Sequence, residues 1–220
     1  AVSTGSFGHG YFSSKLGIGG APTQKLDVSG GHISLDYAYN LYLDGGSDTY
    51  ITSNAADKIT LATGGSSRVT IDSGGRVGFN NTSPTEALHI KSTSNSATPV
   101  ILLENTNAGN LAPQINFYNK SVSPADGDYA GQIDFEGNDS AGNRTVYSRI
   151  ITEQYRVLNG SEDGIMDLQV AVDGTLTTGI RIRGGAGAYV GLGASNPAEK
   201  LEVVGNIRIS NAGYIDTGTT

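Results

Sequence analysis

The sequence predicts an all-β protein. Three observations support this fold class: short stretches in which apolar side chains alternate with others, glycine-rich turns between them, and a recurring Gly/Pro motif. Glycine contributes 32 of the 220 residues, about twice its usual share of ~7%. Charged residues make up 16%, against a norm of about 25%. The apolar residues are thinly spread, so we expect many short strands around a thin core.

The alternation is clearest in residues 33–43, where large apolar or aromatic side chains occupy every odd position. A period of two predicts a strand or hairpin with one buried face. Residues 145–158 are rich in β-branched and aromatic side chains and lack helix caps, so they too predict a strand. Shorter pairs with the same spacing are Ile59/Leu61, Val69/Ile71, Val77/Phe79, Leu88/Ile90, Ile101/Leu103, Ile115/Phe117, Ile133/Phe135, Leu168/Val170, Ile180/Ile182, Leu201/Val203 and Ile207/Ile209.

One motif occurs three times: hydrophobic-Gly-hydrophobic, a short linker, Pro, two or three residues, then Leu-x-[Val/Ile]. Glycine permits close backbone approach, whereas proline fixes its φ angle and cannot take part in a central ladder. Each copy therefore predicts a strand, a tight corner and a second strand. The residues assigned to this structural corner are Gly17, Ile18, Pro22, Leu26, Val28, Gly78, Phe79, Pro84, Leu88, Ile90, Gly191, Leu192, Pro197, Leu201 and Val203.

The three prolines are unequally spaced along the chain, which excludes a regular solenoid or propeller with a fixed period. We therefore expect modules of different size joined by these corners. The predicted parts are a leader or linker at 1–16, a β fibre module at 17–75, a second module at 76–187 with a larger β-sandwich-like insert at 97–183, and the start of a third module at 188–220. The first residues have no signal-peptide pattern and no initiator Met, so we expect a piece of a longer protein.

Together with Asp-Lys-Ile-Thr-Leu-Ala-Thr-Gly-Gly at 57–65 and Arg-Val-Thr-Ile-Asp at 68–72, these motifs resemble the distal tail-fibre proteins of tailed bacteriophages, which include receptor-binding adhesins. The stretch from Pro99 to Gly193 is similar to a module often found there. The resemblance implies an elongated modular fibre of triangular or intertwined β structure, assembled as a parallel homotrimer. The second motif copy departs from the pattern at Phe79-Asn80 and at Ala87, where Lys is usual.

The resemblance also implies an extracellular place on the virion, as a rigid shaft segment or as an adhesin for host attachment. The implied partners are further copies of the chain, adjacent fibre or tail proteins, and a host-surface glycan or protein. The receptor-binding residues stay unknown from sequence. The longest polar connections, at 104–113, 119–130, 137–145 and 159–164, are the candidate display loops.

A trimer also follows from the pattern itself. Many short strands with thin cores leave strand edges exposed, and exposed edges must be paired, covered or closed. Three chains around one axis could do this by sharing their apolar rows. The chain contains no Cys, so disulfides cannot staple it, and oligomerisation is the remaining device.

Composition excludes several function classes. The net charge of −7 argues against nucleic acid, because phosphate binding requires a basic surface. No run of about 18 apolar residues exists, so membrane insertion is not expected. Without Cys there is no zinc–thiolate site and no thiol nucleophile. Residues 138–143 imitate part of a calcium loop but lack its last ligand, so a hairpin loop is predicted there and neither a metal nor a cofactor is expected.

Catalytic candidates are sparse. The three histidines, His9, His32 and His89, lie outside any nucleophile elbow. Asp134 and Glu136 flank Phe135 and are predicted to share the solvated face of one strand. A glycosidase needs two carboxylates about 5–9 Å apart beside a sugar cleft, and the chain has no Trp to stack on a sugar. We therefore predict a non-enzyme. The alternatives are a polysaccharide-degrading tailspike that uses these carboxylates, or a non-viral microbial surface filament or adhesin.

Overall fold

The computed structural model describes residues 16–18, 26–28, 32–35, 38–93, 100–106 and 108–208. These residues form fourteen strands, β1 to β14, and contain no helix. The all-β class is therefore confirmed. The chain divides into two units, residues 1–104 and residues 105–220, which are described separately.

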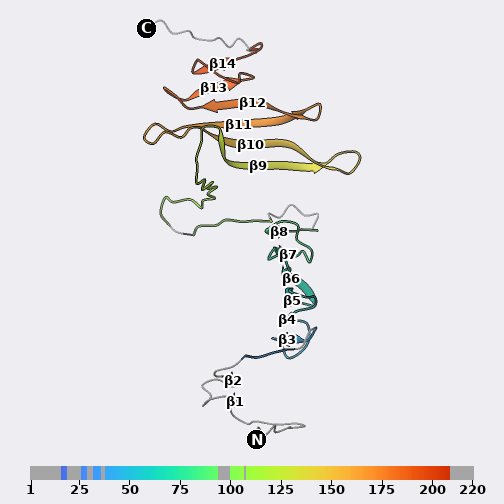
Figure 1. Cartoon of the computed structure of the whole chain (residues 1–220). Helices are drawn as coiled ribbons and strands as arrows, with labels where there is room; N and C mark the ends of the chain where they lie inside the picture. The colour runs from blue at the N-terminus through green and yellow to red at the C-terminus, as the bar shows by residue number, and fades with distance from the viewer. Residues whose placement is uncertain are drawn as a thin grey trace. The chain divides into compact units, whose positions relative to one another are not determined.

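The first unit contains a small sheet and a six-stranded sheet (Figure 1). The small sheet pairs β1 (Leu16–Ile18) with β2 (Leu26–Val28) in parallel. The larger sheet has its strands in chain order: β3 (Asn40–Tyr42), β4 (Tyr50–Thr52), β5 (Ile59–Thr63), β6 (Ser66–Ile71), β7 (Val77–Phe79) and β8 (Leu88–Ile90). Its neighbours are antiparallel except for the last pair, β7 and β8, which is parallel.

The second unit contains one six-stranded sheet of the same topology. Its strands, again in chain order, are β9 (Asp128–Asn138), β10 (Arg144–Arg156), β11 (Asp163–Val172), β12 (Thr175–Arg183), β13 (Tyr189–Leu192) and β14 (Leu201–Val203). Figure 1 shows them side by side. Here too every pair is antiparallel except the last, β13 and β14.

The two six-stranded sheets also share their register. Both contain an irregularity at the corresponding place, directly after Leu61 in β5 and after Leu168 in β11. The same six-stranded unit therefore occurs twice, and strand length accounts for much of the unequal motif spacing. One apolar row crosses each sheet: Leu41, Ile51, Leu61, Val69, Phe79 and Ile90 in the first, and Ile133, Ile150, Leu168, Ile180, Leu192 and Val203 in the second.

Several predicted strands differ from the structure. Of the predicted strand at 145–158, residues 145–156 lie in β10, which ends at Arg156. In contrast, only Asn40–Tyr42 of the alternating stretch 33–43 is a strand, and residues 36–37 lie outside the described residues. The pairs Ile101/Leu103 and Ile115/Phe117 lie in irregular backbone. Alternation predicts which face a strand would bury, but a strand also needs a hydrogen-bonded neighbour, and these pairs have none within the described part of the chain.

The expected module boundaries fall inside the two large sheets. The boundary at 75/76 separates β6 from β7, and that at 187/188 separates β12 from β13, although both pairs are hydrogen-bonded neighbours. The expected β-sandwich-like insert at 97–183 is corrected by the structure: its strands β9 to β12 belong to one sheet, and no second sheet faces them among residues 108–208. Long strands, rather than an additional layer, account for the size of this region.

Three hairpin loops are organised by an aspartate at their start. Asp44, Asp72 and Asp139 each accept hydrogen bonds from backbone N–H groups of their own loop. These bonds lower the pKa of all three carboxyls. The backbone N–H of Arg76 is the main cause for Asp72, and the side-chain amide of Asn143 is the main cause for Asp139. The predicted hairpin loop at 138–143 is thus present, with its carboxylate bound to the loop itself.

The effect is largest at Asp44. Loss of hydration works against the charged form, but the backbone N–H groups of Asp48, Ser47 and Thr49 outweigh it and lower the pKa of Asp44 to about 2. The same three N–H groups lie 2.9–3.2 Å from its carboxylate oxygens. The loop between β3 and β4 is therefore closed only while Asp44 is ionised.

We expect stability to fall as the pH drops from the ordinary aspartate value of 3.8 toward about 2. In this window the unfolded chain binds more protons than the folded one, so acid favours unfolding. Thermal melting followed by circular dichroism at a series of pH values measures the effect. Asp44→Asn should flatten the profile, whereas Asp57→Asn, on an exposed turn, should leave it unchanged. A melting temperature that is constant across this window would contradict the prediction.

Candidate functional site

The three motif copies form the same local structure. In each copy the two motif strands lie side by side in parallel, with Leu16 opposite Leu26, Val77 opposite Leu88, and Val190 opposite Leu201. The last two copies close the six-stranded sheets at their C-terminal edges. Pro22, in the first copy, lies outside the described residues. We call the connections at residues 80–87 and 193–200 the two corners.

Each corner folds back over the glycine of its first strand. A Cβ atom on Gly78 would lie 2.1 Å from the carbonyl oxygen of Asn81, and one on Gly191 would lie 2.5 Å from that of Ala194. Both distances are below any normal contact, so only glycine fits between the flanking apolar residues. This steric constraint explains the hydrophobic-Gly-hydrophobic pattern of the motif.

The backbone enters both corners in the left-handed region. Asn80 has φ = +51° and Gly193 has φ = +70°. Asparagine is among the few residues that tolerate this conformation, so the departure from the usual glycine at position 80 preserves the corner. The N–H of Asn80 donates to Arg68 O at 2.8 Å, and that of Gly193 donates to Gly179 O at 3.0 Å. Farther along, the corner prolines Pro84 and Pro197 are both buried.

A capping residue completes each corner. The middle residue of Leu-x-[Val/Ile] accepts a hydrogen bond from the backbone N–H that follows the corner proline. Thr85 N lies 3.4 Å from His89 Nδ1, and Ala198 N lies 2.8 Å from Glu202 Oε2. Sequence reasoning did not assign this role. Its signal is that the middle residue is a hydrogen-bond acceptor in every copy, with Asp27 in the first.

The sheet face beneath the corners is polar and well buried. Thr60 and Thr70, paired across β5 and β6, are each 1% exposed. Their counterparts in the second sheet are Asp167, 4% exposed, and Arg181, which form an ion pair at 2.7 Å. Arg181 also donates to the carbonyl oxygen of Ser195 at 2.7 Å. The ion pair with Asp167 therefore holds the Arg181 side chain in place, and the hydrogen bond from Arg181 to Ser195 O holds the corner against the sheet.

The opposite face of each sheet is apolar and exposed. Leu61 and Phe79 in the first sheet are 38% and 43% exposed, and Leu168 and Met166 in the second are 38% and 42% exposed. In a self-contained domain the apolar side chains are usually the buried ones and the polar side chains the exposed ones, so the arrangement of these two faces is the reverse. Among the described residues the buried hydrophobic side chains are Ala62, Ile151, Ile165 and Ala194. Ile151 and Ile165 lie on the face of Asp167, opposite the exposed apolar face.

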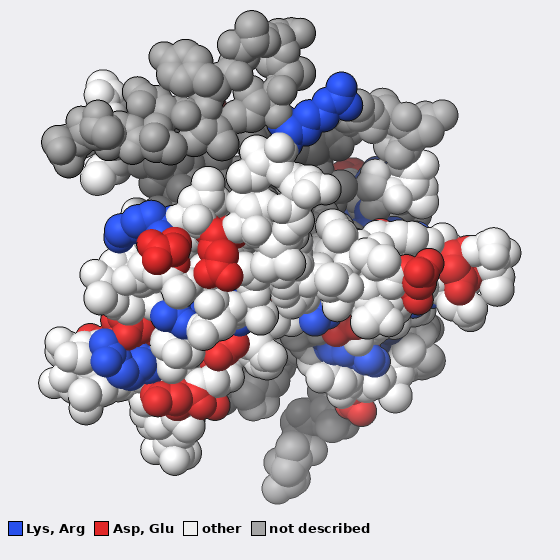
Figure 2. Space-filling view, turned by 90° about the horizontal axis from the view of Figure 1, so that it is seen from above, with Lys and Arg blue, Asp and Glu red and all other residues white. Residues whose placement is uncertain are grey.

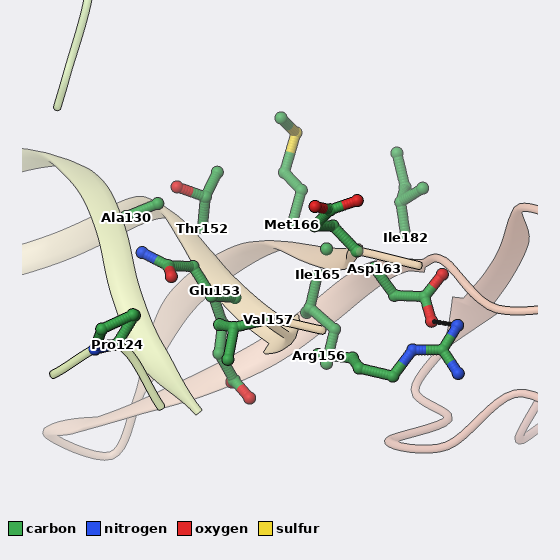
Figure 3. A pocket seen from close by; sticks show the side chains of 13 residues that line it. Pro124, Ala130, Thr152, Glu153, Arg156, Val157, Asp163, Ile165, Met166 and Ile182 are labelled. Atoms are coloured by element: carbon green, nitrogen blue, oxygen red, sulfur yellow. Dashed lines mark ion pairs between the residues drawn. The ribbon is translucent and has the colours of Figure 1, made fainter. Parts of the chain in front are cut away.

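Figure 3 shows the two faces at one end of the second sheet. Thr152, Met166 and Ile182 point to one side of the sheet, and Glu153 points to the other. They border an open hollow of about 680 Å³, whose edge carries the ion pair of Arg156 and Asp163 at 2.6 Å. The hollow is a continuation of the exposed apolar face rather than an enclosed ligand cavity.

The two candidate catalytic carboxylates are both engaged by arginines. Asp134 lies 2.6 Å from Arg149, and Glu136 forms an ion pair with Arg144. The hydrogen bond from Arg149 holds the pKa of Asp134 below its usual value, whereas a glycosidase general acid requires a raised pKa. Neither carboxylate lines the hollow of Figure 3. This geometry is that of a cross-strand ion-pair ladder.

The histidines are far from forming a common site. His32 lies in irregular exposed backbone and His89 lies in strand β8, while His9 is outside the described residues. No group of three His, Cys, Asp or Glu side chains in the described ranges could hold a metal ion. On the face drawn in Figure 2, acidic and basic side chains lie interspersed among uncharged residues, so that face carries no extended field of one sign.

No protein-family model matches the chain, and no curated protein matches it. A search of the described ranges for a helix long and apolar enough to cross a membrane finds none.

We expect Gly191→Ala to destabilise the second unit by about 1–3 kcal/mol, because the new methyl group must displace the backbone of the corner. The matched control is Gly179→Ala on the neighbouring strand β12. There the nearest atom to a Cβ would be Leu168 O at 3.8 Å, so the change should have little effect. Denaturant unfolding of both variants measures the difference. Equal unfolding midpoints for the two variants would show that the corner does not require glycine.

We expect His89→Ala to lower stability by about 0.5–1 kcal/mol, since the N–H of Thr85 loses its acceptor. His89→Glu introduces the residue found in the equivalent corner and should restore the cap. The melting temperatures of the two variants and the parent protein, compared in one buffer, test this role. If both substitutions have the same effect, the side chain at this position is not a cap.

Proposed function

We propose that this chain is a structural segment of an extracellular fibre of a viral tail, that it works as a parallel homotrimer, and that it is not an enzyme. The observation that carries the proposal is the exposed apolar face of both six-stranded sheets. Covering this face with further copies of the chain would supply the core that a single chain lacks.

The energetic case rests on the apolar row of each sheet. Full burial of one Leu, Ile, Val or Phe side chain stabilises a protein by about 1.5–3 kcal/mol. Each row contains six such side chains, and members such as Leu61, Phe79 and Leu168 remain more than one-third exposed. Soluble monomers rarely leave contiguous apolar patches of this kind uncovered. A large part of the available stabilisation is thus reserved for association.

Two features favour copies of the same chain as the covering partner. The apolar row recurs in the same register in both sheets, so parallel copies would bring each sheet against its own equivalent. The row also contains no charged side chain that a different partner would have to match. Closed rotational symmetry would then bury the faces without leaving an open surface for further growth. The number three comes from the resemblance to tail fibres.

The irregular apolar segments support intertwining. Ile101, Leu102 and Leu103 are exposed and lack a strand partner within the described residues. Among the described residues, the edge strands β3, β8, β9 and β14 each have a ladder partner on one side only. An alternating segment that pairs with an edge strand gains hydrogen bonds, and the edge strand is no longer exposed. If such segments paired with the edge strands of neighbouring copies, both the segments and the edges would acquire partners.

The remaining surface suits a shaft that could also display loops. The polar face of the second sheet carries its own ion pairs, such as Asp134 with Arg149. The loops at 119–130, 137–145 and 159–164 lie in polar, largely exposed backbone. We propose these loops for contact with a host-surface glycan or protein, and the chain ends for contact with adjacent fibre or tail proteins.

The rival functions have less support. A polysaccharide-degrading tailspike would require free carboxylates beside a cleft, but Asp134 and Glu136 are held in ion pairs. A microbial surface filament would have the same architecture and differ only in its source.

We expect the purified chain to sediment as a trimer. Ile133→Ser with Leu168→Ser, two substitutions in the apolar row, should shift it toward monomer, because each copy loses about 1.5–3 kcal/mol of burial per side chain. The matched control is Gln169→Ser, on the opposite face of the same strand, which should leave the trimer intact. Sedimentation velocity and light scattering measure the assembly state. A stable monomer of the parent chain would overturn the proposal.

A further inference from the structure

The turn between β10 and β11 contains Asn159-Gly160, which is the one Asn-Gly pair in the sequence. Both residues are exposed. Gly160 has φ = +79°, and the N–H of Ser161 donates to Leu158 O at 2.8 Å, so the pair occupies the centre of a tight turn. Within the described part of the chain, the side-chain amide of Asn159 has no hydrogen-bond partner.

We propose that Asn159 is a site of spontaneous deamidation, independent of the function proposed above. The backbone nitrogen of Gly160 loses its proton to hydroxide and attacks the side-chain carbonyl carbon Cγ of Asn159. The bond from Cγ to the amide nitrogen breaks, ammonia leaves, and a five-membered succinimide forms. One water molecule then opens the ring at either carbonyl, which gives aspartate or isoaspartate. The net reaction is amide plus water to carboxylic acid plus ammonia.

Two local features select this asparagine. Its successor is glycine, which has no side chain to hinder the attacking nitrogen, and its own amide is free to rotate. Asn143, in the hairpin loop between β9 and β10, is the natural comparison. It is also exposed, but its Nδ2 donates to Asp139 Oδ2 at 3.0 Å, and its successor is Arg144.

Glu162 slows the reaction at Asn159. The N–H of Gly160 donates to Glu162 Oε1 at 3.0 Å, so the attacking nitrogen is held in a hydrogen bond that must break first. The carboxylate also opposes loss of the proton, because it would place two negative charges about 3 Å apart. At the dielectric constant of water this repulsion corresponds to a factor of about ten in rate.

The product would change the turn. Isoaspartate adds one carbon to the backbone, which is incompatible with the bond from Ser161 to Leu158. Arg156 donates to Ser161 O at 2.6 Å and pairs with Asp163 at 2.6 Å, so the disturbance would reach the edge of the hollow in Figure 3. Either product adds a negative charge beside Glu162 and Asp163. The fraction of molecules with aspartate or isoaspartate in place of Asn159 would therefore increase with the age of the protein.

The test is incubation of the intact protein at mildly alkaline pH in a buffer made with oxygen-18-labelled water, followed by peptide mass mapping. Label and the amide-to-acid mass change should accumulate at Asn159 faster than at Asn143. Enzymatic methylation of isoaspartate should identify the rearranged product at the same peptide. Asn159→Gln should abolish the signal, since the longer side chain would have to close a six-membered ring.

Glu162→Gln separates the role of the carboxylate from that of the site. We expect deamidation at Asn159 to be three- to tenfold faster in this variant, with the rate at Asn143 unchanged. A slower rate would mean that the carboxylate acts as a base and would overturn its assigned role. Equal rates at Asn159 and Asn143 in the parent protein would overturn the site itself. Circular dichroism of each variant before incubation confirms that the fold is retained.

Discussion

The structure depends on one constraint: each six-stranded sheet carries an apolar row that the described part of the chain leaves partly or largely exposed. The row from Leu41 to Ile90 and the row from Ile133 to Val203 are continuous across six strands, yet the threonines and ion pairs on the other face are the better buried side chains. Water cannot remain on such a face at low cost. In the assembly proposed above, further copies of the chain would cover this face and complete the core.

The corners decide which face is left for that assembly. Because each corner folds back over Gly78 or Gly191, it covers the polar face and leaves the apolar one open. The residues beneath the corners differ between the two sheets. The first sheet uses the pair Thr60 and Thr70, whereas the second uses Asp167 and Arg181, with Arg181 bonded to the corner. The same corner backbone is thus compatible with two different pairs of side chains beneath it.

Much of the fold could be predicted from the sequence, and the reasons for the misses are physical. Alternation located most strands of the six-stranded sheets, and the glycine of the motif marked a close backbone approach. The common six-stranded unit was hidden, because β9 to β12 are much longer than β3 to β6. Unequal proline spacing then suggested different modules. The ion pair of Asp134 with Arg149 depends on cross-strand register, which period-two patterns do not specify.

A repeated unit with fixed register and variable strand length has a mechanical consequence. In the proposed assembly, each unit would bring its own apolar row against the equivalent row of the next copy, so specificity would accumulate along the chain without any single strong contact. Lengthening strands, as in β9 to β12, widens the polar face and its loops while the apolar row keeps its six positions. In the proposed fibre, the rows could therefore keep their side chains while the outer surface diverged. This separation of roles would suit a fibre whose surface had to follow a changing target.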